Sequence, residues 1–154
     1  MTTTLSALTH EQALALIEPF YNLFRSDKRD WEKGFASLAD DWKSWDGNDT
    51  YRTKADTRGF MEGLFASVPD IQVLNLQLVV EGDVIAVRSE LTGTPQGEFF
   101  GVPHSGRSFH IMAVDFNRVR DGKLVELYHC ENWAIAVSQL RGVWRGAGET
   151  SARP

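Results

Sequence analysis

The sequence predicts an α+β fold in which helices come first and antiparallel strands follow. Apolar residues recur at helical spacing before position 69, and from position 71 onward they form long runs typical of strands. Two turn signals, EGD at 81–83 and RDGK at 120–123, join those runs in pairs. Long strands wrapped over a helical layer predict a strongly curved sheet whose concave side forms a pocket.

Three helices are predicted in the N-terminal half. The first follows Thr9, which stands three residues before Gln12 in a capping-box pattern, and its apolar residues continue to Phe24. Pro19 is expected to kink this helix. A second helix is predicted to start at Asp30 and to include WEKGFASLA, 31–39. The third covers KADTRGFMEGLFASV, 54–68, and ends before a proline.

The strands are predicted mainly in the C-terminal half. DDWKSWDG, 40–47, is predicted as a short extended segment, and four long antiparallel strands are expected over 71–80, 84–93, 108–119 and 123–132. WAIAVSQL, 133–140, is expected to close the fold as a short helix. A long glycine-rich connection, GTPQGEFFGVPHSGR at 93–107, joins the two middle strands. Because a strand follows it, it does not match a dinucleotide-binding loop, and loops of this length are often functional.

Length and composition limit the possible classes of protein. The 154 residues predict a single domain over 1–154 with its core at about 9–140 and frayed ends at 1–8 and 145–154. The net charge is −5 and the basic residues are scattered, which argues against a nucleic-acid partner. The single Cys130 excludes an intramolecular disulfide. Without a secretory signal or a long apolar run, we expect a cytoplasmic protein with no membrane contact.

Several motifs together resemble a known family. PDIQV (69–73), EGDVIAVRSELTGT (81–94), GEFFGVPHSGR (97–107), VDFNRVRDGKLVE (114–126) and ENWAIAVSQL (131–140) follow in the order typical of the SnoaL-like polyketide cyclase family. That family has the cone-shaped fold of nuclear transport factor 2 and ketosteroid isomerase. The resemblance covers about 14–140 and implies a curved sheet closed by three N-terminal helices, an interior ligand cavity and a homodimer.

The last two strands carry the residues best suited to chemistry. By the alternation of side chains, one face of the first strand holds Ile111, Ala113, Asp115 and Asn117, and one face of the second holds Val125, Leu127, His129 and Glu131. Whether these faces coincide depends on the turn between the strands. A two-residue turn would pair Asp115 with Tyr128, whereas a three-residue loop with a bulge would align it with Leu127 and His129.

The resemblance implies that Asp115 and His129 line one cavity. His129 stands where characterised cyclases of the family have their acid/base aspartate, and Asp115 stands where they have a histidine. The family's glutamine and asparagine are replaced by Ala113 and, to within about one residue, Ser44. Because of these replacements, the resemblance does not imply that the chain catalyses the cyclases' own reaction. A His/Asp pair nevertheless remains at the two positions. A carboxylate beside an imidazole fixes its tautomer and stabilises its protonated form, so such a pair can move a proton.

The remaining expectations concern the cavity wall and the other histidines. The substrate-binding residues are predicted to be Tyr21, Trp42, Ser44, Trp45, Ala113, Leu127 and Glu131. His110 is expected outside the cavity, and His104 contacts either a ligand or solvent. The four dispersed histidines lack metal-ligand spacing, so neither a metal nor another cofactor is expected.

Three functions fit these features. The first is a cofactor-free acid/base enzyme that catalyses an aldol cyclisation, an isomerisation or a lyase step on a small apolar or aromatic carbonyl compound. In it His129 acts as base and Asp115 orients it. The alternative is a non-catalytic module that binds a small hydrophobic ligand, with Asp115 and His129 joined in an inert structural hydrogen bond. In the third, the sheet serves only as a dimerisation surface.

Overall fold

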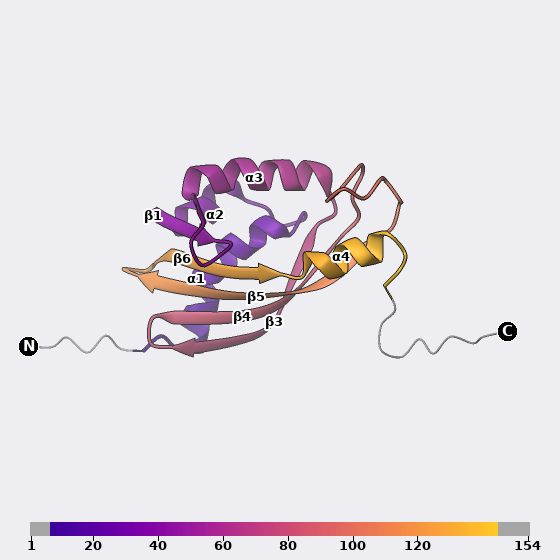
Figure 1. Cartoon of the computed structure of the whole chain (residues 1–154). Helices are drawn as coiled ribbons and strands as arrows, with labels where there is room; N and C mark the ends of the chain where they lie inside the picture. The colour runs from indigo at the N-terminus through magenta and orange to yellow at the C-terminus, as the bar shows by residue number, and fades with distance from the viewer. Residues whose placement is uncertain (1–6, 145–154) are drawn as a thin grey trace, which may run out of the picture.

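The computed structural model describes residues 7–144 (Figure 1). Its elements follow in the order α1 (His10–Tyr21), the 3₁₀ turn η1 (Asn22–Phe24), α2 (Trp31–Ala36), β1 (Leu38–Trp45), β2 (Tyr51–Thr53), α3 (Lys54–Ser67), β3 (Gln72–Glu81), β4 (Val84–Gly93), β5 (Phe109–Arg120), β6 (Lys123–Glu131) and α4 (Trp133–Leu140). This order of three helices before the main strands confirms the predicted α+β class.

The six strands form one curved sheet in the order β2-β1-β6-β5-β4-β3. The strands β3 to β6 are antiparallel neighbours, as the hairpin signals predict. The strand β1 runs parallel to β6, a pairing that no local pattern indicates. Figure 1 shows α3 facing the curved sheet across the interior, with α4 continuing from the end of β6. In the described part of the chain, no helix has the length and apolar character needed to cross a membrane.

The predicted helix starts are present, but one predicted end is wrong. Thr9 caps α1 in a reciprocal capping box with Gln12, and Asp30 caps α2. The helix α2 ends at Ala36 and not at position 39, because Leu38 is fully buried where β1 begins and pairs there with Leu124. The expected frayed ends lie outside the described residues except for positions 7 and 8. Leu8 is partly buried and packs against the core.

A β-bulge in β6 decides the register of the β5–β6 hairpin. The turn itself has two residues, since Arg120 pairs with Lys123. That turn alone would place Asp115 opposite Tyr128, but Val119 pairs with Leu124 whereas Arg118 pairs with Glu126. Val125 is therefore an extra residue, and the register moves by one so that Asp115 lies directly opposite His129. The turn therefore has two residues, as in the first alternative, and the strand carries a bulge, as in the second.

The inner face of the sheet, α1 and α3 enclose the core. Val125 follows the buried Leu124 and is itself buried, so the bulge places two consecutive apolar side chains away from water. The alternation on β5 buries Ile111, Ala113, Asp115 and Asn117 and leaves Met112 and Phe116 half-exposed on the outer face. From Leu127 to Glu131 the bulge thus brings the predicted face of β6 together with that of β5 on the inner side of the sheet, whereas Val125, predicted for the same face, is not part of the core cluster and does not line the cavity.

Candidate active site

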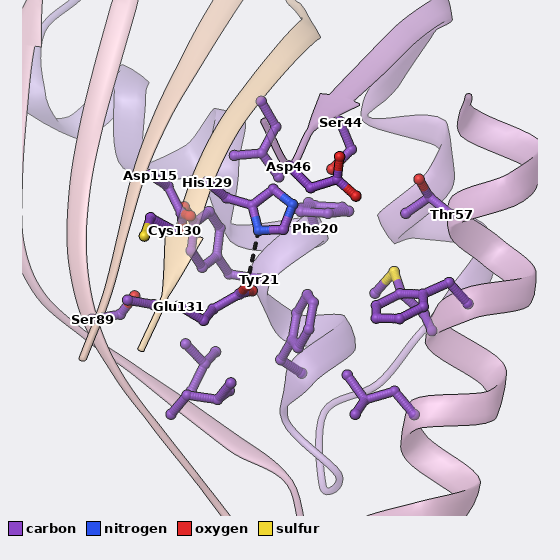
Figure 2. Close-up of a pocket in the computed structure, with 18 of the residues that line it drawn as sticks. Phe20, Tyr21, Ser44, Asp46, Thr57, Ser89, Asp115, His129, Cys130 and Glu131 are labelled. Carbon is purple, nitrogen blue, oxygen red and sulfur yellow. Dashed lines mark hydrogen bonds and ion pairs between the residues drawn. The ribbon is translucent and has the colours of Figure 1, made fainter. Parts of the chain in front are cut away.

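A cavity of about 300 Å³ lies between the inner face of the sheet, α1 and α3. Its walls are largely apolar, with a few polar side chains at fixed positions, as is typical of small-molecule sites. Seven residues predicted for the site line it: Tyr21, Ser44, Ala113, Asp115, Leu127, His129 and Glu131. Figure 2 shows His129 and Glu131 facing the space between the strands and α3.

Trp42 and Trp45 do not line this cavity, which corrects their predicted place in its wall. Trp42 shares the inner face with Ser44 but is fully buried in the core, where its ring packs on Phe20 at 5.6 Å between centroids. Trp45 points to the outer face and stacks on Tyr128 at 5.7 Å. The alternation of side chains correctly predicts that Trp42 shares a face of β1 with Ser44 and that Trp45 points to the other face. Only the fold shows that neither ring reaches the cavity.

Asp115 is held by Tyr21 at the end of α1. The Tyr21 hydroxyl donates to Asp115 Oδ2 at 2.6 Å and accepts from Asn117 Nδ2 at 3.1 Å. Burial raises the pKa of Asp115 to about 6, although the hydrogen bond from Tyr21 opposes this change. Burial and the charge of Asp115 also raise the pKa of Tyr21 well above its usual value. The phenol therefore stays protonated and donates its hydrogen bond to Asp115. Asp115 therefore titrates near neutral pH instead of in the acid range.

His129 is held by Glu131, two residues along the same strand. Glu131 Oε2 lies 3.0 Å from His129 Nδ1 and also accepts the indole N–H of Trp133 at 3.3 Å. An ionised carboxylate only accepts, so Nδ1 carries the hydrogen and Nε2 is the group left for a ligand. Nε2 is buried and has no hydrogen-bond partner among the described residues. Figure 2 shows this nitrogen on the side of the ring away from Glu131.

The electrostatic surroundings favour the protonated imidazole. Burial lowers the pKa of His129, but the hydrogen bond and charge of Glu131, together with the charge of Asp115, outweigh burial and raise this pKa above 6.5. Asp115 and His129 are direct cross-strand partners, and such pairs bring Cβ atoms to about 5 Å. A carboxyl group with a raised pKa and an imidazole with a raised pKa therefore stand side by side in one cavity.

The hydrogen bonding within this site differs from the sequence-based expectation. Asp115 was expected to orient His129, but its hydrogen bond is to Tyr21, and Glu131 is the partner of His129. Glu131 was expected only to contact substrate. The H-x-E spacing on a strand, which puts both side chains on one face, was the signal that could have indicated its role.

The polar groups at the cavity's edge include an ion pair that sequence reasoning missed. Arg52 pairs with Asp46 at 2.9 Å and lies over the ring of Phe60 at 4.3 Å. Both charged residues line the cavity. His110 lies on the outer face beside Glu90 at 3.1 Å, as predicted, and His104 is exposed. Across residues 7–144, no three His, Cys, Asp or Glu side chains are grouped so as to hold a metal ion.

Solved structures resemble the whole fold. The proposed polyketide cyclase IdmH of Streptomyces antibioticus is 29% identical with a TM-score of 0.74, over 84% of this chain and 99% of its own. The proposed hydroxylase AclR of Streptomyces galilaeus is 26% identical with a TM-score of 0.75, over 92% and 91% of the two chains. A SnoaL-like protein from a Jannaschia species, 19% identical, shares the fold with a TM-score of 0.74 over 88% and 96%.

No curated protein matches the sequence at a significant level. A family model does match it, over residues 15–140, and that model describes the SnoaL-like polyketide cyclases. The match includes both strands that carry Asp115 and His129, and it agrees with the curved sheet, the enclosing helices and the interior cavity. The chain therefore belongs to the SnoaL-like polyketide cyclase family.

Proposed function

We propose that this protein is a cofactor-free acid/base enzyme that acts on a small, largely apolar carbonyl compound, by an aldol cyclisation or an isomerisation. One observation carries the proposal: the Nε2 of His129 is buried in a largely apolar cavity without a hydrogen-bond partner within residues 7–144, on the strand position directly opposite Asp115. A module that only binds an apolar ligand does not require a carboxyl group and an imidazole whose pKa values are both raised inside its cavity. Perturbed titratable groups in a cleft are typical of catalytic sites.

The pKa values indicate which group takes which role. Between about pH 6 and the raised pKa of His129, Asp115 is ionised and His129 is protonated. Asp115 is then the base, and its raised pKa makes it a stronger proton acceptor than an exposed carboxylate. His129 is the charged hydrogen-bond donor, with its Nε2–H directed into the cavity. These roles are the reverse of those expected from the sequence, in which His129 was the base.

The reaction begins with proton transfer from carbon to Asp115. The free Asp115 oxygen accepts a proton from the carbon next to a substrate carbonyl, and the C–H electrons form an enolate. The Nε2–H of His129 stabilises the negative oxygen, because it is a charge-assisted donor in a dry site. In an aldol cyclisation the enolate carbon attacks a second carbonyl of the same molecule. The resulting alkoxide then takes the proton back from Asp115, so no atom is lost.

The family and the neighbours support a carbonyl substrate. IdmH, which is 29% identical to this chain, is a proposed polyketide cyclase. An aldol cyclisation of the kind proposed here requires carbonyl groups both to form the enolate and to accept it. Ser44, Thr57 and Ser89 line the same cavity, and the hydroxyls of Thr57 and Ser89 are buried without partners among the described residues. They can orient oxygen substituents of the substrate, which agrees with a ligand of mixed apolar and carbonyl or hydroxyl character.

Hydrogen–deuterium exchange at carbon tests the proposal without knowledge of the natural substrate. The probe is 2-tetralone, a cyclic ketone with an acidic C–H, followed by proton NMR in D₂O. The wild-type protein should accelerate the exchange, and Asp115→Asn should reduce the acceleration by a factor of about 100 or more. His129→Gln keeps an N–H donor and should retain more activity than His129→Ala.

Two outcomes would contradict these assignments. Equal exchange by Asp115→Asn and wild-type protein would exclude Asp115 as the base. Equal loss in His129→Gln and His129→Ala would favour the reverse roles, since only a base requires an imidazole. If 2-tetralone binds to the wild-type protein but does not exchange, the binding-module alternative is supported instead.

We also propose that the outer face of the sheet forms a homodimer. A row of apolar and aromatic side chains crosses five strands in register there, formed by Val79, Ala86, Phe116, Tyr128 and Trp45. Val79, Phe116 and Tyr128 are each exposed by more than two fifths. A contiguous exposed apolar patch on a sheet favours burial against a partner, and the family resemblance implies a second copy of the chain.

A further inference from the structure

A strained turn stands at the edge of the cavity. Phe99 and Val102 exchange both backbone hydrogen bonds of a two-residue hairpin, at 3.0 and 2.9 Å. The two residues between them, Phe100 and Gly101, have φ values of +46° and +71°. Such turns favour Asn-Gly or Gly-Gly, because a bulky side chain is strained at positive φ. A phenylalanine at this position therefore requires an explanation other than backbone preference.

Burial does not supply that explanation. The side chain of Phe100 is 54% exposed, whereas the neighbouring Phe99 is buried and stacks on Phe109 with centroids 6.0 Å apart. Phe99 therefore attaches the turn to the core. Phe100 instead lines the cavity, and its ring meets that of Trp133 at 5.1 Å. Strain and exposure both oppose a purely structural role for Phe100, and strain of this kind is common where a ligand binds.

The loop that carries this turn is fixed to the helices around the cavity. Thr94 N donates to Asp70 Oδ1 at 2.8 Å, and Gln96 N donates to the carbonyl oxygen of Ser67 at 2.9 Å. These two bonds attach the start of the loop to the last residue of α3 and to the turn that follows this helix. The ring of Phe100 is thus presented to the cavity from a defined position.

We propose that Phe100 and Trp133, here called the aromatic edge, form a subsite that binds the planar, unsaturated part of the ligand. Trp133 lines the cavity and also donates its indole N–H to Glu131, the partner of His129. A ligand ring held at the aromatic edge therefore lies next to the Glu131–His129 pair. A carbonyl substituent on that ring can then reach the imidazole of His129. The subsite selects for flat ligands, since aromatic contacts strengthen binding beyond the apolar area that is buried. It uses the cavity of the proposed function but does not depend on which residue is the base.

Two probes of matched size test this subsite by isothermal titration calorimetry. These are 2-naphthol, which is planar, and decahydro-2-naphthol, which is saturated and puckered. Wild-type protein should bind 2-naphthol about fivefold to tenfold more tightly than the saturated probe. Phe100→Gly should lose most of this preference while its thermal midpoint stays equal or rises, because glycine relieves the positive φ.

Phe100→Asn provides a second variant, since asparagine also tolerates this backbone conformation. Leu14→Ala is the control, because Leu14 is a 43% exposed apolar residue on α1 that does not line the cavity. It should keep the preference for 2-naphthol. The proposal is overturned if wild-type protein does not prefer the planar probe or binds neither probe. It is also overturned if Phe100→Gly and Phe100→Asn bind like wild type, or if both unfold at a markedly lower temperature. Because binding is measured and not proton exchange, failure here is distinguishable from failure of the proposed function.

Discussion

Replacement of Asp115 by asparagine should stabilise the protein at neutral pH. Asp115 is only 8% exposed, and burial raises its pKa from 3.8 to about 6. Because the raised pKa means that the native state binds this proton more tightly than the unfolded chain, stability is lost as pH rises through this range. The loss is absent below about pH 4 and complete above about pH 6. A pKa change of this size corresponds to about 3 kcal/mol of unfolding free energy.

Asparagine is neutral at every pH, and its amide oxygen can still accept the hydrogen bond from Tyr21. We therefore expect Asp115→Asn to raise the unfolding free energy by up to about 3 kcal/mol near pH 8 and by about half of that near pH 5. In a domain of this length, 3 kcal/mol corresponds to a rise of about 6–12 °C in the thermal midpoint.

Urea unfolding followed by tryptophan fluorescence measures this difference at both pH values, since the chain has five tryptophans. Asp41→Asn is the control of opposite sign. The hydrogen bond and charge of Arg120 lower the pKa of Asp41, so this variant should be slightly less stable near neutral pH. A gain at Asp115 that is the same at both pH values, or a loss at both, would refute burial of the charge as the cause.

Three further predictions follow from the same structure. The rate of exchange catalysed by the wild-type protein should depend on pH as a bell-shaped curve, with an acid limb near pH 6 from Asp115 and an alkaline limb above pH 6.5 from His129. Glu131→Gln should move the alkaline limb to lower pH, because Glu131 raises the pKa of His129. A profile that is unchanged in Glu131→Gln would show that Glu131 does not act on His129. Gly93→Ala should lower the free energy of unfolding by about 1–3 kcal/mol in urea, because its Cβ would clash with a methyl group of the fully buried Val68. Equal stability would show that Val68 can move. Phe116→Asp should convert a dimer into a monomer in light scattering after size exclusion, and a dimer that persists would exclude the outer face as the interface.

Local patterns were sufficient for much of the fold. Thr9 with Gln12 and Asp30 mark helix starts because a side chain can satisfy backbone N–H groups within a few residues. The alternation on β5 and β6 likewise assigned Asp115 and His129 to definite faces of their strands. Such signals depend on neighbours in the sequence, so they can be recognised without the tertiary structure.

The sequence alone determined which side chains could meet, but the tertiary structure decided which of them do. The bulge at Val125 sets the register that pairs Asp115 with His129, and it places the two consecutive apolar residues Leu124 and Val125 in buried positions. The partner of Asp115 is Tyr21, which lies 94 residues away in the sequence. Burial by the whole core, and not any local motif, raises the pKa of Asp115. Local order arises from short-range hydrogen bonding, whereas register and desolvation arise from contacts that exist only after the sheet has closed over the helices.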